Sequence, residues 1–384
     1  MNGSMTQPVH PPPKAHVLIL APKAPGQGLG GAERHLQDLA NVLSPLCQKV
    51  TFLSHQEAPA PGSFVRLLTR IEPMLASPLA VRRLSRRGLP EADVVMSIEL
   101  MGVGLSHPRH LHLFFGSYAG FRSMALRPAS GLRAWVQAAK SVLARWLERR
   151  TQSRFGSIAN SQGLRDVLIS QGIPVNETIL LPPTDCNLFQ PGDQLAARAK
   201  LGLPTSGRVI LFAGRWEYAK GADRVARIAA QMPRDWHLLI ATPLGYSWPL
   251  PRGSNVTTRI GLSTAQMVTA YQAADALIQP SRFEGYSLVA SEAQACGCPV
   301  LTSPVGQAAH YLQAKEEDIC ASVIANPDAA EAWISALERV FAAGPTTRPA
   351  HRQYAETHVS YEVVQRHWQA ELARLFPEFS WHRS

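Results

Sequence analysis

Short apolar runs alternate with amphipathic, helix-like stretches along most of the chain. In the first half, four such runs predict buried strands of a parallel sheet, namely residues 16–20, 50–53, 93–97 and 110–115. The stretches between them are long enough for crossover helices, and after Glu33 apolar residues recur at helical spacing. The alternation starts again with runs at residues 208–213, 237–241, 274–278 and 300–302. Two such series predict an α/β protein with two Rossmann-like domains that face each other across a central cleft.

Prolines, glycines and the last amphipathic stretch divide the chain into segments. Residues 1–14 are polar and rich in proline, and we expect a disordered N-terminal tail. A further strand-like run at residues 178–181 precedes a Pro- and Gly-rich linker, which places the domain boundary between residues 15–190 and residues 191–360. Residues 361–384 contain a helix whose apolar face needs a partner, and the N-terminal domain is the candidate.

Composition and cysteine usage exclude several classes of protein. Of the 384 residues, 46% are hydrophobic and 17% are charged, which excludes collagen-like and wholly disordered chains. No apolar run approaches the ~18 residues that span a bilayer, and no secretory signal precedes the first strand, so we expect a cytoplasmic protein. The five cysteines include no C-x-x-C pair, so we expect reduced thiols and no structural metal.

Positive charge is concentrated in the first half of the chain. The formal net charge is +10, and residues 1–190 carry +9 of it. A basic surface can attract nucleic acid, anionic lipid or phosphorylated small molecules. A basic nucleic-acid-binding protein is therefore an alternative, but the chain has no interleaved aromatic platforms and no recognisable reading motif. We therefore expect no nucleic acid among its partners.

A glycine-rich loop separates the first predicted strand from the first predicted helix. Gly26, Gly28 and Gly31 match the G-x-G-x-x-G fingerprint of dinucleotide-binding proteins. The match is weak, because residues 21–25 separate the glycines from the strand and no carboxylate ends the second strand to bind a ribose. A nicotinamide-dependent oxidoreductase therefore ranks below two other interpretations. The loop either faces a phosphate or sugar hydroxyl with its backbone N–H groups, or is rich in glycine only to turn tightly.

Charged residues follow two predicted strands of the second half. Arg215 and Lys220 come just after residues 208–213, where cations can neutralise a diphosphate. Glu284 and Glu292 stand eight residues apart, the first before a predicted helix and the second on it. At the carboxyl end of a parallel sheet, a carboxylate can accept two hydroxyl protons from a vicinal diol of ribose or hexose. The alternative for all four is an ordinary solvated surface residue.

Together these motifs resemble the retaining glycosyltransferases of family four, which have the GT-B architecture, over nearly the whole chain. The resemblance rests on Gly30-Gly31-Ala-Glu-Arg-His, segments 158–161 and 180–191, Gly214-Arg215 through Lys220-Gly221, Gln279-Pro-Ser281, and Glu284-x7-Glu292. The last motif is the most specific. The resemblance implies two facing Rossmann-like domains with a C-terminal helix, and an enzyme that moves a sugar from a UDP- or GDP-linked donor to a hydroxyl acceptor with retained configuration.

The resemblance also implies roles for individual residues. Arg215 and Lys220 would hold the donor diphosphate and Glu284 would bond the transferred sugar, which makes these three the main catalytic candidates. Glu292 would bond the ribose hydroxyls. The other donor-binding candidates are the backbone of Gly30 and Gly31, Gly261 and Leu262 near the nucleobase, and Gly285, Tyr286, Ser287 and Leu288 of the glutamate motif. No D-x-D sequence occurs, so we expect no metal, and no cofactor besides the nucleotide sugar itself.

One position departs from the family pattern. Family members often have a histidine just beyond a strand of the first domain, facing the transferred sugar, whereas here Phe115, Gly116 and Ser117 occupy that strand end. His112 lies within the strand and is the fourth catalytic candidate. A strand histidine that is bonded to a backbone group is the alternative.

Basic clusters in the first half favour a membrane-bound setting. Arginines recur at one-turn spacing in residues 82–87, and residues 132–150 combine a helical apolar stripe, which includes two tryptophans, with cations mostly outside it. The stripe alone indicates a helix packed on the core, but the two clusters together favour peripheral binding to an anionic membrane surface. A glycan or lipid-linked acceptor in bacterial polysaccharide or lipopolysaccharide assembly would fit. A GT-B nucleotide-sugar epimerase is the alternative, and it would convert the donor without any acceptor.

Overall fold

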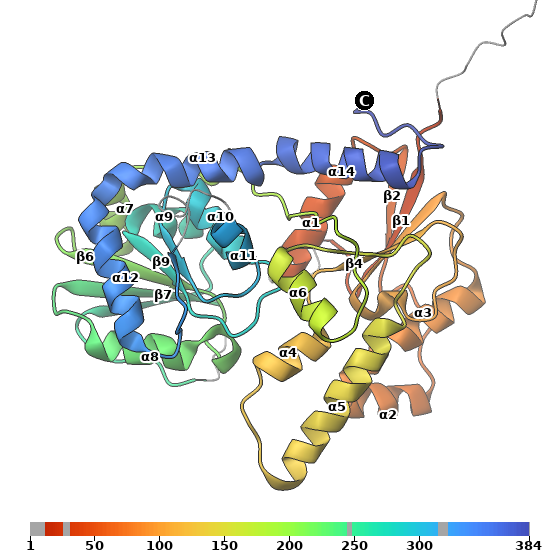
Figure 1. The fold of residues 1–384 in the computed structure, drawn as a ribbon, viewed down its shortest axis with the longest axis horizontal. Coiled ribbons are helices and arrows are strands. Elements are labelled where there is room, and N and C mark those ends of the chain that lie inside the picture. The colour runs from red at the N-terminus through yellow and green to blue at the C-terminus, as the bar shows by residue number, and fades with distance from the viewer. Residues whose placement is uncertain (1–11, 26–30, 244–247, 314–321, 384) are drawn as a thin grey trace, which may run out of the picture.

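The structure of the protein is a computed structural model that describes residues 12–25, 31–243, 248–313 and 322–383. Two α/β domains lie side by side, and each is built on one parallel sheet covered by helices (Figure 1). The fold class predicted from the alternation of strands and helices is therefore confirmed. Gly26, Gly28 and Gly30 of the glycine loop lie outside the described residues.

The first domain is built on five parallel strands in the order β2-β1-β3-β4-β5. The strands are β1 (His16–Leu20), β2 (Lys49–Leu53), β3 (Val94–Ile98), β4 (His110–Phe114) and β5 (Ser157–Ala159). The helical segments are α1 (Gly31–Leu43), α2 (Ser63–Ile71), η1 (Pro73–Leu75), α3 (Ala76–Arg87), η2 (Glu99–Gly102), α4 (Tyr118–Met124), α5 (Gly131–Arg149) and α6 (Gln162–Ser170). All of β3 and all but the first residue of β1 are buried, which explains why their sequences are mostly apolar.

The second domain is built on six parallel strands in the order β11-β10-β9-β6-β7-β8. The strands are β6 (Arg208–Ala213), β7 (Trp236–Thr242), β8 (Val256–Ile260), β9 (Ala276–Gln279), β10 (Val300–Thr302) and β11 (Ser322–Val323). The helical segments are α7 (Gln194–Leu201), η3 (Tyr218–Lys220), α8 (Ala222–Gln231), α9 (Thr264–Ala273), α10 (Leu288–Ala295), α11 (Ala308–Gln313), α12 (Ala330–Ala343), η4 (Gly344–Thr347) and α13 (Arg348–His358). The last helix, α14 (Tyr361–Leu375), leaves this domain.

The strands differ from the sequence prediction in two ways. Residues 178–181 form no strand and make only one bridge, between Ile179 and Ala159. In the other direction, β5, β8 and β11 were not expected. β5 and β11 have only three and two residues, too few for an apolar run to stand out. β8 has the sequence Val-Thr-Thr-Arg-Ile and is half-exposed at the edge of the sheet, so it lacks the pattern of a buried strand.

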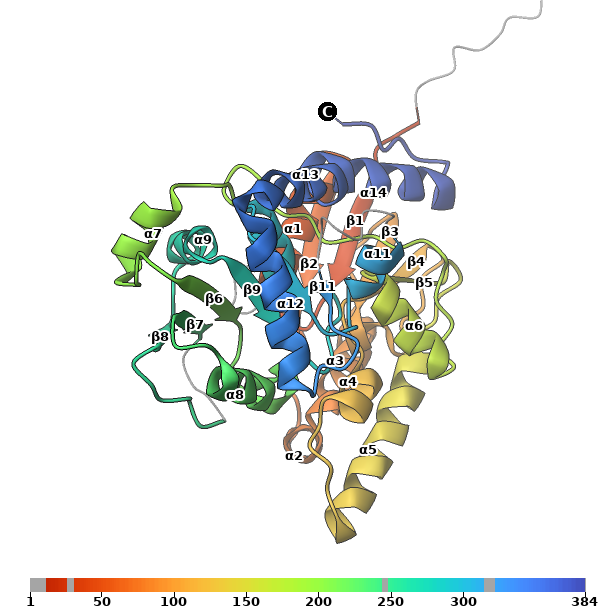
Figure 2. The same cartoon turned by 60° about the vertical axis from the view of Figure 1, so that its left-hand side comes forward.

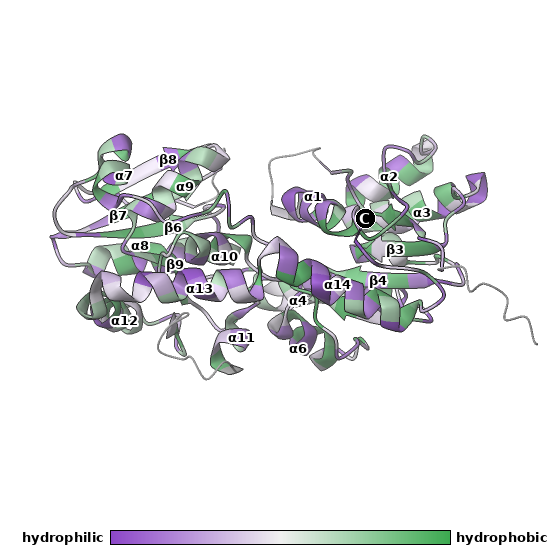
Figure 3. Cartoon of the chain, turned by 90° about the horizontal axis from the view of Figure 1, so that it is seen from above, coloured by the Kyte–Doolittle hydropathy of each residue, from purple (hydrophilic) through white to green (hydrophobic). Residues whose placement is uncertain are grey.

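The chain returns to the first domain through its last two helices. α13 lies over the second domain and α14 over the first, so that together they span one side of the molecule in Figures 1 and 2. In Figure 3 both hydrophilic and hydrophobic residues are visible along α14. Val364, Trp368 and Leu372 of α14 belong to the core cluster that also contains side chains of β1 and α1. The C-terminal helix is thus part of the core of the first domain.

Loss of the α14 anchor should destabilise the protein. Trp368 is 4% exposed, so Trp368→Ala should lower the free energy of unfolding by about 3–5 kcal/mol through lost burial and the cavity left behind. Arg366→Ala is the matched control, because Arg366 is exposed on the same helix, and it should cost less than about 0.5 kcal/mol. Urea unfolding followed by circular dichroism measures both variants. Equal stability of the two would contradict the packing of α14.

Candidate active site

Lys220 and Glu284 form an ion pair where two neighbouring strands of the second domain end. Lys220 ends η3 after β6, and Glu284 lies in the loop after β9. Lys220 Nζ lies 2.8 Å from each carboxylate oxygen of Glu284, and the Ser281 hydroxyl donates to Oε1 at 2.7 Å. The two side chains are 25% and 11% exposed, so the pair keeps limited access to solvent. The structure thus brings together two of the residues that the sequence singled out.

A close backbone approach makes this pair possible. Gly221 follows Lys220 with a φ of +79°, a conformation that favours glycine, and a Cβ there would lie 2.1 Å from the carbonyl oxygen of Pro280. η3 can therefore lie directly against the loop that carries Ser281 and Glu284. A larger residue at position 221 would separate the two loops and, with them, the two charges.

Two arginines with little exposed surface hold the same loop, and sequence reasoning missed both. Arg282 donates to the two carboxylate oxygens of Asp223 at 2.7 and 2.9 Å. Arg224 is 7% exposed and donates to the carbonyl oxygens of Pro280 and Ser281 at 3.0 and 3.4 Å. A guanidinium can bond several acceptors at once, so these contacts fix the shape of the loop. Because Asp223 and Arg282 are 59 residues apart, no local spacing pattern reveals their pairing.

Arg215 is close to the pair in sequence but does not join it. Its Nη2 lies 3.0 Å from Glu217 Oε1, and 61% of its side chain is exposed. An exposed guanidinium on a loop can turn toward an anion, and Arg215 would then give up its ion pair with Glu217, whose side chain is 25% exposed. Arg215 is therefore available to a ligand but is not held in place for one.

Glu292 is buried on α10, so the alternative of a solvated surface glutamate is wrong. Its side chain is 6% exposed. The Tyr271 hydroxyl donates to Oε2 at 2.7 Å, and Nη2 of Arg34, on α1 of the first domain, lies 2.6 Å from Oε1. Burial raises the pKa of the Glu292 carboxyl, while the charge of Arg34 and the hydrogen bond from Tyr271 oppose the rise. Each carboxylate oxygen therefore has a partner, one from each domain.

The two domains touch through backbone next to the ion pair. A Cβ at Gly285 would lie 1.9 Å from the carbonyl oxygen of Phe115, at the end of β4, so only glycine fits there. The Ser161 hydroxyl donates to the carbonyl oxygen of Gly285. Nearby, the Gly163 N–H donates to the Gly306 carbonyl oxygen at 3.1 Å. The loop that carries the glutamate motif is thus fixed from both domains.

The next three residues of the motif shape the start of α10. Tyr286 is 7% exposed, and its hydroxyl accepts a hydrogen bond from Ser291, so its ring points into the domain. The Ser287 side chain caps the helix by accepting from the Ala290 N–H. Leu288 packs against the core cluster of the second domain. Among these residues, backbone N–H groups rather than side chains are the groups that a ligand could use.

The remaining donor-binding candidates lie at the ends of elements. Gly31 is the first residue of α1, while Gly30 lies outside the described residues. Gly261 directly follows β8 with a φ of +66°, and its N–H donates to the Thr242 carbonyl oxygen at 2.9 Å. Leu262 packs against the core. Because all strands of the sheet are parallel, the end of β8 lies on the same edge of the sheet as the ion pair.

His112 is buried inside the first domain. Its Nδ1 lies 2.7 Å from Ser97 Oγ, which also lies 2.7 Å from His110 Nε2. A Cβ at Gly102 would lie 2.8 Å from His112 Nδ1, so that glycine makes room for the ring. Burial lowers the pKa of His112 well below its ordinary value and that of His110 to about 4. His112 is completely buried, and the partner of its Nδ1 is the Ser97 side chain rather than the backbone group of the alternative. A catalytic role for His112 stays a prediction.

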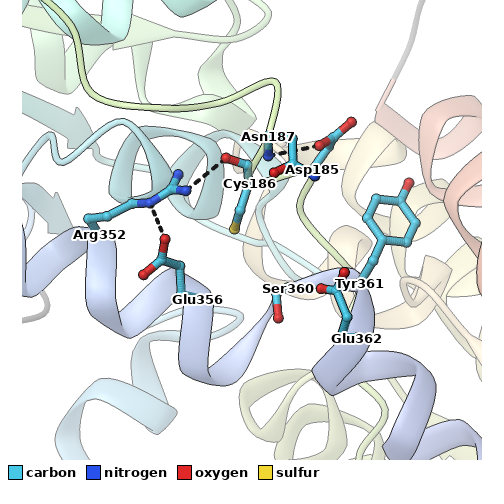
Figure 4. A pocket seen from close by; sticks show the side chains of 8 residues that line it. All are labelled: Asp185, Cys186, Asn187, Arg352, Glu356, Ser360, Tyr361 and Glu362. Atoms are coloured by element: carbon cyan, nitrogen blue, oxygen red, sulfur yellow. Dashed lines mark hydrogen bonds and ion pairs between the residues drawn. The ribbon is translucent and has the colours of Figure 1, made fainter.

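Two cavities lie away from these residues. One of about 220 Å³ sits between the interdomain linker and the junction of α13 with α14, and is lined by Asp185, Cys186, Asn187, Arg352, Glu356, Ser360, Tyr361 and Glu362 (Figure 4). The other, of about 740 Å³, includes Arg154, Asn176 and Arg374. Neither cavity is lined by a candidate donor-binding residue. The first cavity lies beside the connection between the domains, where Arg352 donates hydrogen bonds to both Glu356 and the Cys186 carbonyl oxygen.

The second domain resembles proteins of known family. Residues 193–357 match the family described as Glycosyl transferases group 1. A relative, D-inositol 3-phosphate glycosyltransferase from Mycobacterium leprae, is 37% identical over 151 residues, which are 36% of this chain and 35% of the relative. The chain thus spans about a third of the length of that relative.

Solved structures resemble nearly the whole chain. Sucrose-phosphate synthase from Thermosynechococcus elongatus superposes with a TM-score of 0.74 at 18% identity, over 94% of this chain and 99% of that one. HepE from Anabaena in complex with UDP-glucose superposes with a TM-score of 0.62 at 15% identity, over 94% of this chain and 100% of that one. Residues 193–357 thus match the glycosyl transferases group 1 family, within a chain that has the GT-B fold.

Proposed function

We propose that this protein is a retaining glycosyltransferase that moves a sugar from a UDP- or GDP-linked donor to a hydroxyl of an acceptor. The observation that carries the proposal is the cluster of Lys220, Ser281 and Glu284 at the carboxyl edge of the second sheet, in the part of the chain that matches glycosyl transferases group 1. The cation can attract phosphate oxygens while the carboxylate accepts sugar hydroxyls, so the cluster suits a sugar diphosphate. Because HepE was solved with UDP-glucose, a uridine nucleotide is the first donor to test.

In this proposal Lys220 and Arg215 hold the donor diphosphate. Negative charge grows on the diphosphate as its bond to the sugar breaks, and the two cations stabilise that charge more than they stabilise the intact donor. The N-terminus of α10, which begins after Ser287, adds positive potential. The leaving phosphate accepts the proton of the acceptor hydroxyl, which attacks the same face of the sugar, so the anomeric configuration is retained.

The two glutamates recognise the two sugars of the donor. Glu284 bonds hydroxyls of the transferred sugar and Glu292 bonds the ribose, while Gly261 and Leu262 lie at the nucleobase end. Contacts with fixed neighbours orient both carboxylates before a substrate arrives. We propose that no divalent cation takes part, because the chain has no D-x-D sequence and its described residues include no cluster of three His, Cys, Asp or Glu that could hold one.

We further propose that the first domain docks on an anionic membrane surface and takes a lipid-linked acceptor from it, as in bacterial polysaccharide or lipopolysaccharide assembly. Two helices support this. α2 buries none of its residues, and its Phe64, Leu67 and Ile71 are 70%, 55% and 64% exposed. On α5, Leu132, Trp135 and Trp146 are 79%, 77% and 50% exposed. The expectation that the α5 stripe packs on the core is therefore wrong, since only Ala144, Leu147 and Glu148 of α5 are buried.

Basic side chains accompany these apolar ones. The exposed arginines are Arg66 and Arg70 on α2, and Arg133, Arg145 and Arg149 on α5. Figures 1 and 2 both show α2 and α5 at the same end of the first domain, with α5 projecting beyond the rest of it. Tryptophan at headgroup level together with arginine near anionic lipid is a combination that binds a bilayer interface. No helix in the described part of the chain is long and apolar enough to cross a bilayer.

Removal of either charge of the central pair should impair the donor site. Wild-type protein should gain thermal stability from UDP or GDP by mass action, in the presence or absence of EDTA. Lys220→Ala should weaken binding of that nucleotide at least about tenfold, because it removes a charged contact to the phosphates. Glu284→Gln should lower transfer of the sugar at least about tenfold. Lys200→Ala and Glu331→Gln, at exposed positions on α7 and α12, are the controls.

Nucleotide titrations, nucleotide release from the matching nucleotide sugar and the anomeric configuration of the product by NMR measure these effects. Nucleotide binding that is unchanged in Lys220→Ala would contradict the proposed diphosphate site. Conversion of the donor without an acceptor would favour an epimerase instead.

Membrane docking should depend on the exposed tryptophans. The double variant Trp135→Ser/Trp146→Ser should bind phosphatidylglycerol-containing vesicles at least about tenfold more weakly, because burial of each indole at the interface is lost. Its unfolding midpoint should stay unchanged, since both side chains are exposed. Leu195→Ser, at an exposed position on α7, is the control and should bind as the wild type does. Vesicle co-sedimentation measures the partition, and wild-type protein that stays in the supernatant would refute docking.

A further inference from the structure

Glu292 has no free carboxylate oxygen in this structure, although the proposed function requires it to accept hydroxyl groups of the ribose. Oε2 is bonded by Tyr271 on α9, and Oε1 is paired with Arg34 on α1. The side chain is only 6% exposed, which leaves little room for a third group. On the basis of the proposed function, we propose that Arg34 and the donor ribose compete for Glu292, so that a donor must displace Arg34 in order to bind.

The two partners of Glu292 differ in their freedom to move. Tyr271 is completely buried, so its hydroxyl cannot leave the carboxylate without disturbing the core. The Arg34 side chain is 41% exposed and lies in the first turn of α1. An exposed guanidinium can turn into solvent and be hydrated there. The ribose therefore replaces Arg34, and Tyr271 stays.

A neighbouring charge and burial both disfavour ionisation of Glu292, so its carboxylate depends on Arg34. Asp38 lies one turn along α1 from Arg34, and its negative charge disfavours ionisation of Glu292. Burial also raises the pKa of Glu292, and Arg34 is the cation that opposes both effects. When the ribose enters, Arg34 moves away and the buried Glu292 carboxylate loses its cation. This loss costs free energy that the hydrogen bonds from the ribose hydroxyls must offset. Arg34 therefore weakens the binding of the nucleotide.

The competition also links the nucleotide to the contact between the domains. Arg34 belongs to the first domain and Glu292 to the second, so the pair is one of the bonds that hold the domains together. A bound ribose opens this bond, and departure of the nucleotide restores it. Re-formation of the pair would favour release of the nucleoside diphosphate after transfer.

A comparison of two nucleotides tests this competition. The probes are UDP or GDP, whichever binds the wild type, and its 2′,3′-dideoxy analogue, which has no ribose hydroxyls. Isothermal titration is performed in slightly alkaline buffer to favour the ionised carboxylate. Arg34→Ala should bind the ribonucleotide about threefold to tenfold more tightly, the range of a partly exposed ion pair. The same variant should bind the dideoxy analogue as the wild type does, and Gln37→Ala, an exposed position on the same helix, should change neither.

Each other outcome overturns a different statement. Ribonucleotide binding that is weaker or unchanged in Arg34→Ala overturns the competition. Equal binding of the two nucleotides by Arg34→Ala, in which no cation competes for the carboxylate, shows that Glu292 does not hold the ribose, which also overturns the competition but leaves the diphosphate site in place. Failure of the wild type to bind either nucleotide overturns the proposed function together with this inference.

Discussion

The backbone contact between Gly285 and Phe115 is the constraint on which the geometry of the site depends. No side chain fits between these two positions, so the loop that carries Glu284 lies directly against the end of β4. Gly163 and Gly306 meet in the same way, and a Cβ at Gly163 would lie 2.4 Å from the carbonyl oxygen of Gly306. Since backbone is far less deformable than side chains, these contacts fix how closely the two domains approach beside the glutamate motif.

The charged groups near the site fall into two kinds according to their exposure. Arg224 is buried, the side chains of the Arg282–Asp223 pair are 10% and 12% exposed, and all three residues hold the loop after β9. Such groups must keep their partners, because a charge left alone in the interior is costly. Lys220 and Arg215 are more exposed and have carboxylate partners that an anionic ligand could share or replace. The less exposed groups keep the loop after β9 in one shape, while Lys220 and Arg215 can turn toward a substrate.

Much of the fold could be predicted because a buried strand needs mostly apolar residues, and these are visible as a run in the sequence. β1, β3 and β6 are central and largely buried, so their residues are mostly apolar. The edge strand β8 escapes detection, since a half-exposed strand needs no such run. Lys220 and Glu284 could be found because parallel strands end at one edge of a sheet, where short motifs gather. Contacts such as the ion pair of Arg34 with Glu292 could not be predicted, because they join positions far apart in the chain and depend on how the domains meet.

The solvent side of α5 illustrates another limit of periodicity. A helical apolar stripe shows that a helix has a hydrophobic face, but it does not say what covers that face. In this protein 77% of Trp135 and 50% of Trp146 are exposed.

The way in which the chain crosses between the domains also restricts their motion. The chain crosses between the domains twice, first at Thr184 between α6 and α7 and again at Ser360 between α13 and α14. Thr184 forms a parallel bridge with Ser360, and the Thr184 N–H donates to the Val359 carbonyl oxygen at 2.7 Å. Two crossings that are bonded to each other resist twisting, whereas a single flexible linker would allow it. A rotation of the domains about this paired segment would leave both of these bonds in place. During such a rotation the displacement of a side chain grows with its distance from Thr184. A small rotation therefore moves the side chains at the far end of the interface the most.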